Sequence, residues 1–120
     1  MMSQSIKLNN NMYWDISSIH GTDLVTQTVN VPANTTMTIN TPENAKAIIF
    51  SIPLGSAVDG FGIFAIGRQG GTTRIRKAVV PCSLVTLNTS AGSTVENKIT
   101  NSTAYSVRLL ILTNYELTFT

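Results

Sequence analysis

The segment that most constrains the fold is residues 103–119 (TAYSVRLLILTNYELTF), because it predicts one strand, or a strand and its continuation, with no polar face. Successive side chains of an extended chain alternate between two faces. The alternation gives two sets: Val107, Leu109 and Ile111 on one face, and Leu110 and Leu112 beside Arg108 on the other. Both faces must be covered, which is typical of a strand in the middle of a β-sandwich or between subunits.

The rest of the chain has the same β character. Apolar residues recur at spacing two and β-branched residues are abundant, and no segment has the pattern of a helix. Residues 47–52 are, like the closing segment, apolar on both faces, so we expect a central strand or a subunit interface there. The predicted strands are 12–17, 25–31, 36–40, 45–52, 62–66, 73–80, 84–87, 94–99 and 105–119.

Turn residues separate these strands. Pro32-Ala33-Asn34 lies between two alternating segments, and Gly70-Gly71 offers the positive φ angles of a tight hairpin. Short strands at regular spacing predict an all-β fold, a single antiparallel β-sandwich of about eight strands, jelly-roll-like. We expect an N-terminal docking arm at residues 1–11 and the sandwich domain at residues 12–120.

Composition excludes several classes of function. Charged residues are 12% of the 120 residues, against about 25% in ordinary domains, and the net charge is only +2. The sequence therefore does not predict nucleic-acid binding, which usually requires a clustered basic face. No apolar run reaches the roughly 18 residues of a membrane helix, and the opening residues do not resemble a secretory signal, so we expect synthesis in the cytosol and no membrane insertion.

Catalytic residues are not expected, and neither is a cofactor or a metal. His20 is the single histidine and has no nucleophile beside it in a recognisable motif; Cys82 is the single cysteine and is interpreted as a small buried side chain. One histidine and one cysteine do not make a zinc site without distant carboxylates. The acidic residues are scattered singly, so no glycosidase pair is indicated. The sequence predicts that the protein is not an enzyme.

Four residues are candidates for ligand binding. Arg74 and Arg76 alternate on one predicted strand and should share a face, with Arg68 across the Gly70-Gly71 hairpin. This cluster could bind an anionic glycan, a teichoic-type phosphate or carboxylates of a neighbouring subunit, or it could be a solvated edge strand whose charges prevent aggregation. Trp14 could stack on a sugar ring or seal one end of the sandwich.

Four residues of the closing strand are candidates for an oligomer interface. These are Val107, Arg108, Leu110 and Leu112. The low charge of the chain suggests that one apolar face of this strand serves the sandwich and the other a neighbouring subunit.

Two segments resemble proteins of tailed bacteriophages. Residues 5–19 (SIKLNNNMYWDISSI) look like the opening of small structural proteins and fibre-tip domains of phage tails, and residues 31–39 (VPANTTMTI) are similar to hairpins of phage adhesin and decoration sandwiches. The resemblance implies a virion component, made in the host cytoplasm and released by lysis, commonly a homotrimer that contacts other virion proteins.

This resemblance leads to one functional hypothesis with two alternatives. The first is a tail-fibre or tail-associated adhesin that contributes to host attachment, with a host surface glycan as partner. The second is a capsid decoration protein that stabilises the head. The third is a soluble carbohydrate-binding module outside any virion.

Overall fold

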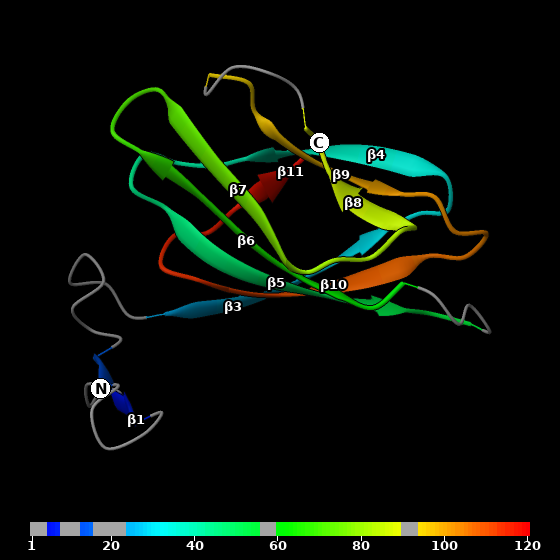
Figure 1. Ribbon diagram of the computed structural model, residues 1–120, viewed down its shortest axis with the longest axis horizontal. Helices are drawn as coiled ribbons and strands as arrows, with labels where there is room; N and C mark the ends of the chain where they lie inside the picture. The colour runs from blue at the N-terminus through cyan, green and yellow to red at the C-terminus, as the bar shows by residue number, and fades with distance from the viewer. Residues whose placement is uncertain (1–4, 8–12, 16–23, 56–59, 90–93) are drawn as a thin grey trace.

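The computed structural model describes residues 5–7, 13–15, 24–55, 60–89 and 94–120. Within these ranges the chain forms eleven strands and no helix. Two short strands, β1 (Ser5–Lys7) and β2 (Tyr13–Asp15), pair antiparallel with each other as a separate sheet. All remaining strands belong to two sheets (Figure 1). The predicted boundary between arm and sandwich, residues 11 and 12, lies outside the described residues.

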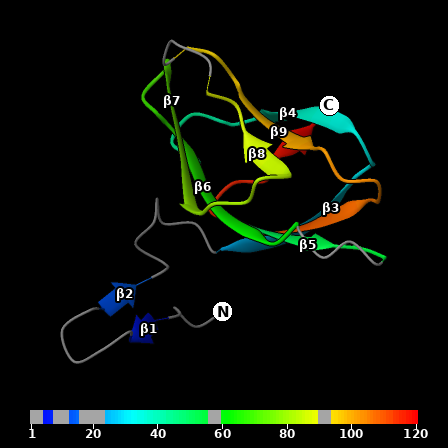
Figure 2. The same cartoon turned by 45° about the vertical axis from the view of Figure 1, so that its right-hand side comes forward.

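The two sheets face each other as a sandwich, which confirms the predicted fold class (Figure 2). The five-stranded sheet has the order β3-β10-β5-β6-β7 and the four-stranded sheet the order β11-β4-β9-β8. Every pairing within them is antiparallel. The strands of the five-stranded sheet are β3 (Val25–Val31), β5 (Lys46–Pro53), β6 (Gly62–Gln69), β7 (Thr73–Val80) and β10 (Val107–Thr113). Those of the four-stranded sheet are β4 (Thr35–Asn40), β8 (Val85–Leu87), β9 (Asn97–Asn101) and β11 (Thr118–Phe119).

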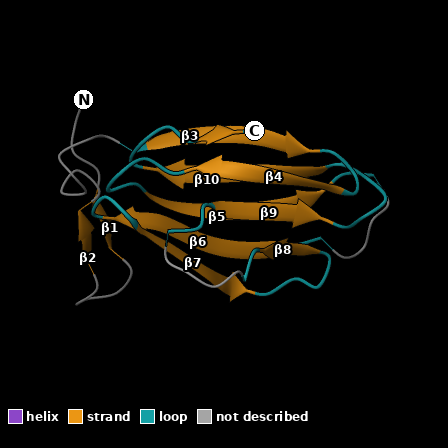
Figure 3. Ribbon diagram, turned by 90° about the horizontal axis from the view of Figure 1, so that it is seen from above, coloured by secondary structure: helices purple, strands orange, loops and turns teal. Residues whose placement is uncertain are grey.

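The core lies between the sheets, whose strands run roughly along one axis when seen from above (Figure 3). In β5, β6, β9 and β10 alternate residues point inward and are buried, as period-two alternation requires. The largest apolar members of this core are Phe64, Ile39, Ile49, Ile99, Leu109, Val31, Val85 and Val107. Each such side chain contributes about 1.5–3 kcal/mol by leaving water.

The closing segment differs from the single strand that residues 105–119 predicted. It contains two strands, and they belong to different sheets: β10 in the five-stranded sheet and β11 in the four-stranded sheet. The chain turns between them because two polar residues bind backbone groups there. The Thr113 hydroxyl donates to Tyr115 O at 2.6 Å, and the Asn114 side chain bonds Lys46 N and Asn44 O. Asx and Thr side chains of this kind compete with the ladder and end a strand.

The connections between the other strands contain residues that tolerate positive φ angles. Asn34 and Asn44 have φ angles of 53° and 65°, in the left-handed region that asparagine tolerates better than most residues. The predicted hairpin at Gly70-Gly71 joins β6 to β7, and Gly70 has a φ of 60°. The segment 12–17, predicted as a strand of the sandwich domain, contains β2, which pairs with β1 and with neither large sheet.

Candidate functional site

The outward face of the five-stranded sheet carries apolar side chains in cross-strand rows. In the first row, backbone register places Leu110 opposite Phe50, Phe50 opposite Ile63, and Ile63 opposite Val80. In the second row, Leu112 lies opposite Ile48, and Ile48 opposite Ala65. We call these seven residues the apolar face: Ile48, Phe50, Ile63, Ala65, Val80, Leu110 and Leu112.

The apolar face is accessible to solvent, although its residues are of the type usually buried. The side chains of Phe50 and Leu110 are 40% and 39% exposed, whereas the next residue along β10, Leu109, is fully buried on the inner face. Exposed rows of this kind that run across several strands mark surfaces for interaction rather than ordinary solvent-facing sheet. They are the clearest candidate site in the described part of the chain.

The outward face of the four-stranded sheet provides an internal comparison, because it is built from polar residues. Thr36 lies opposite Thr100, and their hydroxyls are 2.8 Å apart; Thr100 also lies opposite Thr86, and Thr38 lies opposite Lys98. A sandwich in water normally shows this alternation of apolar inner and polar outer residues on both sheets. Here only one sheet follows the rule.

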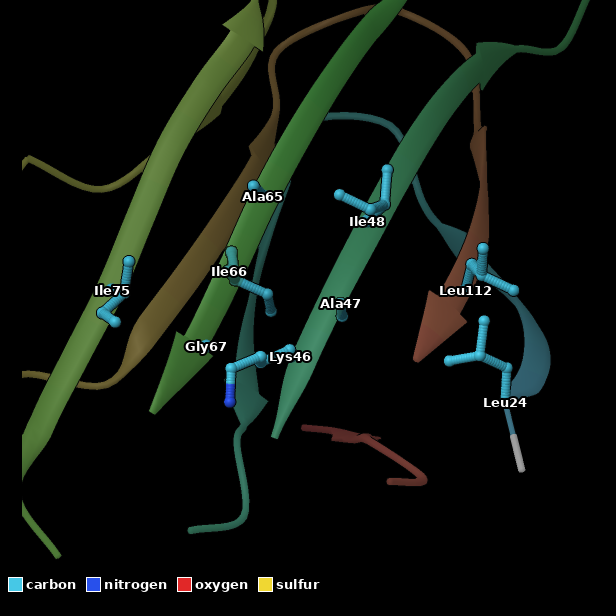
Figure 4. A pocket seen from close by; sticks show the side chains of 9 residues that line it. All are labelled: Leu24, Lys46, Ala47, Ile48, Ala65, Ile66, Gly67, Ile75 and Leu112. Atoms are coloured by element: carbon cyan, nitrogen blue, oxygen red, sulfur yellow. The ribbon is translucent and has the colours of Figure 1, made fainter. Parts of the chain in front are cut away.

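Two shallow depressions shape the apolar face. One, of about 300 Å³, is formed across β10, β5, β6 and β7 with Ile48, Leu112 and Ile75 on its floor and walls and Lys46 at one end (Figure 4). The other, of about 340 Å³, lies toward the opposite end of the same strands and is formed by Phe50, Leu110 and Phe61 among others. The face therefore has depressions into which side chains of a partner can fit.

The predicted arginine cluster lies elsewhere, at the edge of the sandwich. Arg74 and Arg76 share a face of β7, and Arg68 lies directly opposite Arg74 in the register, as the alternation predicted. They point toward the four-stranded sheet: Arg74 Nε lies 2.5 Å from Glu96 Oε1, and Arg76 donates to Asn97 Oδ1 and Val95 O at 2.8 and 2.5 Å.

Arg68 is also bonded within the chain. Its guanidinium donates to Gly71 O, and Nη1 donates to Thr41 O at 3.4 Å. The three arginines therefore satisfy groups of their own chain, and β7 is an edge strand as one interpretation expected, but with its two arginines turned inward rather than to solvent. A role of this cluster in ligand binding stays a prediction.

The structure separates the four predicted interface residues. Arg108, Leu110 and Leu112 lie on the outward side of β10, with Leu110 and Leu112 in the apolar face. Val107 differs from the expectation, because it is 0% exposed in the core beside Leu109. Trp14 lies in β2, opposite Ile6 in the register, and the two arginines of β7 bond residues of the segment around β9 instead of lying in the apolar face.

Sequence reasoning omitted Phe50, Ile63 and Val80 from the candidate residues. For β5 the signal was present, since residues 47–52 are apolar on both faces and were expected to form a central strand or an interface; β5 does lie between β10 and β6. For Ile63 and Val80 the signal was absent, because only the sheet order places β6 and β7 beside β5.

The described residues contain no cluster of three or more His, Cys, Asp or Glu side chains that could hold a metal ion. His20 lies outside the described residues, and Cys82 is buried as expected. In the same part of the chain there is no helix long and apolar enough to span a membrane.

Comparison with known proteins gives a similarity of fold. The structure resembles a crystal structure of the tailspike protein gp49 from Acinetobacter baumannii bacteriophage Fri1, a capsular polysaccharide depolymerase, with a TM-score of 0.61 and 11% sequence identity. The match covers 98% of this chain and 21% of the tailspike chain, so this chain spans about a fifth of that protein's length. At this identity the likeness shows a shared fold.

The other two comparisons found no relatives. No family model matches the sequence, and no curated protein matches it. The apolar face and the fold are therefore the two observations from which a function can be argued.

Proposed function

We propose that this chain is a non-enzymatic structural protein of a tailed-bacteriophage virion, exposed on the particle as a tail-fibre or tail-associated adhesin that contributes to host attachment. The observation that carries the proposal is the likeness of nearly the whole sandwich to one segment of a phage tailspike. The resemblance of residues 5–19 and 31–39 to phage tail and adhesin sequences supports the same class independently.

A homotrimer is the proposed form of the protein on the particle. The apolar face supports self-association, because covering exposed apolar rows with a partner removes them from water. Contacts to other virion proteins and to a glycan of the host surface complete the proposed set of partners. The proposed location is the virion, reached by assembly in the host cytoplasm and lysis.

The non-enzymatic part of the proposal concerns this chain and not the tailspike. That protein is a depolymerase, but this chain corresponds to about a fifth of it. In this chain the carboxylate of Glu96 pairs with Arg74, and the inward arginines hold the two sheets together. These side chains have structural partners, which supports a scaffold rather than a catalytic centre.

Deleting the gene from the phage tests the proposal. An adhesin predicts particles of normal stability that adsorb poorly to the host, and antibody-labelled electron microscopy should then show the protein on the tail. Fragile particles that remain infectious, with label on the head, would instead establish capsid decoration. Intact, infectious particles without label would support the soluble carbohydrate-binding module, which glycan-array binding lost in Trp14→Ala would identify.

Testing whether the arginine cluster binds the host cell requires a variant that keeps the fold. Replacing Arg74 and Arg76 by serine removes the contacts with Glu96 and Asn97, so a loss of cell binding could follow from unfolding. Arg68→Ser is the cleaner variant, since the guanidinium of Arg68 donates to two backbone carbonyls, those of Gly71 and Thr41. Reduced cell binding at an unchanged melting temperature would place the glycan site at the arginine cluster, and unchanged binding would remove Arg68 from it.

A further inference from the structure

We infer that the apolar face of the five-stranded sheet is the surface on which a second copy of this chain packs, sheet against sheet. The inference rests on the self-association in the proposed function and names the surface that makes it. A face that packs against the same face of another copy closes as a pair, so a mass of two chains in solution supports this contact, and a mass of three supports the homotrimer through a different arrangement. The inference concerns the purified protein alone and does not depend on where the protein sits on a virion.

The register is the first argument. Leu110, Phe50, Ile63 and Val80 form one uninterrupted row across four strands, and Leu112, Ile48 and Ala65 form the row beside it. The outer face of the other sheet has threonines at the corresponding outward positions of β4, β8 and β9. One molecule thus contains both a sheet face suited to water and a sheet face suited to burial.

The size of the surface is the second argument. The whole five-stranded sheet, with strands about 4.8 Å apart and some seven residues at about 3.3 Å, outlines roughly 550 Å² before the side-chain surface is added, and the apolar face occupies four of its five strands. A standard stable interface buries about 800 Å² of accessible surface on each partner. A second sheet of the same dimensions covers the whole face, whereas a short peptide would leave most of the two rows exposed.

The charges are the third argument. The cations on this side lie toward the edges of the sheet: Lys46 at the start of β5, Lys77 on the edge strand β7 and Arg108 near the start of β10. Of the acidic residues within 24–55, 60–89 and 94–120, Glu96 is bonded to Arg74, Glu43 lies in the turn before β5, and Glu116 lies between β10 and β11. Outward residues of β3 are neutral and polar: Thr26, Thr28 and Asn30. A second copy can therefore be buried here without burying a carboxylate, and its neutral β3 can hydrogen-bond the flanking cations.

The shape of the apolar face, with its two depressions, is the fourth argument. The two depressions of about 300 and 340 Å³ lie at opposite ends of the same strands. Side chains of two packed sheets interdigitate to reach the density of a protein interior. Phe61 is 63% exposed at the rim of the second depression and is long enough to enter a depression of a facing sheet.

The test compares one cation placed on each sheet. Leu110→Lys puts an ammonium group in the first row, where the monomer leaves it exposed but a packed copy desolvates it; Thr86→Lys puts the same group on the outer face of the four-stranded sheet. Sedimentation equilibrium should show wild type and Thr86→Lys as oligomers and a dissociation constant at least about 100-fold higher for Leu110→Lys. Oligomers of equal strength in all three proteins, or equal weakening in both variants, would overturn the inference.

A second measurement needs no substitution and covers the case in which Leu110→Lys fails to fold. Hydroxyl-radical labelling of wild type should modify Phe50 less at a concentration where it is assembled than at one where it is monomeric. Equal labelling of Phe50 at both concentrations overturns the inference. A wild type that is monomeric at tens of micromolar overturns it too.

These results are separable from those that test the proposed function. A monomer that is nevertheless labelled on the tail refutes the interface and leaves the tail assignment intact. An oligomer assembled through Leu110 and Phe50 but absent from particles refutes the virion role and leaves the interface intact.

Discussion

Arg76 of β7 donates a hydrogen bond from Nε to Asn97 Oδ1 of β9 at 2.8 Å, and so joins the edge strand of one sheet to an inner strand of the other. Asn97 is completely buried, and its side-chain nitrogen lies 3.4 Å from the Thr41 hydroxyl. The second nitrogen of the guanidinium donates to Val95 O at 2.5 Å. The arginine therefore acts as a clasp at the side of the sandwich where β7 and β8 are the outermost strands.

Removing this clasp should destabilise the fold. Arg76→Ala leaves Asn97 Oδ1 and Val95 O without their charged donor, so we expect the free energy of unfolding to fall by about 2–3 kcal/mol. Urea denaturation followed by tryptophan fluorescence or circular dichroism measures the change. Lys77→Ala, the next residue on the opposite face of β7, is the matched control and should change stability by less than about 0.5 kcal/mol. Equal effects of the two substitutions would contradict the clasp.

Asn101 should be among the most sensitive residues of the chain. It is 0% exposed, its amide donates to Val31 O, Pro32 O and Tyr105 O at 2.8–3.1 Å, and its oxygen accepts from Thr103 N and Oγ1. Asn101→Ala leaves these buried groups without their hydrogen-bond partner. We expect the free energy of unfolding, measured by chemical denaturation, to fall by about 3–4 kcal/mol. Asn101→Asp should be at least as damaging, because a carboxylate accepts but cannot donate to the three carbonyls.

The control for Asn101 is Asn30→Ala, on the exposed outer side of β3. It removes the same side chain from a solvated position, so its effect should stay within about 0.5 kcal/mol. Similar losses for the buried and the exposed asparagine would show that the network around Asn101 contributes little.

Two glycines of the β6–β7 hairpin should respond oppositely to alanine. A Cβ on Gly67 would lie 2.9 Å from Ala45 O, a backbone atom held by its own hydrogen bond from Arg68 N. Gly67→Ala should therefore cost about 1–3 kcal/mol. A Cβ on Gly71 has nothing within 4 Å, so Gly71→Ala should be neutral or slightly stabilising. Thermal melts of the two variants decide this, and a lower melting temperature for Gly71→Ala than for Gly67→Ala would be the contrary result.

Cys82 should be protected from thiol reagents in the native state. Its side chain is buried beside Phe64 and Val85, under the edge where β7 crosses toward β8. We expect modification by a chromogenic disulfide reagent to be more than about 100-fold slower in buffer than in denaturant, because reaction requires local or global opening. Arg76→Ala should speed the native-state reaction, since Arg76 and Cys82 line the same pocket beside Phe64 and Val85. Rapid labelling of the wild-type protein would show that this edge opens freely.

The strand pattern could be predicted because it depends on local alternation. The segments 25–31 and 73–80 match β3 and β7, since Pro32, Pro81 and the Gly70-Gly71 turn define their ends in the sequence. The break inside 105–119 was missed, because Thr113 and Asn114 end β10 through bonds to residues about seventy positions away as well as local ones. Period-two alternation carries no information about such distant partners.

The candidate surface was predicted only for one strand. The two-faced character of β10 follows from its own residues, and Leu110 and Leu112 do point away from the core. The arginines of β7 illustrate the opposite case. Alternation placed Arg74 and Arg76 on one face, but only the position of β9 shows that this face looks inward, where Glu96 and Asn97 satisfy them.

The sequence by itself determined that this chain is an antiparallel β-sandwich with little charge and with one strand apolar on both sides. Those properties follow from side-chain alternation and composition, which are local. The tertiary structure decided which strands become neighbours, and therefore that Leu110, Phe50, Ile63 and Val80, far apart in the chain, form one continuous row. The reason is physical: register and sheet order are set by the summed packing of all strands, so a surface that spans four of them exists only after folding.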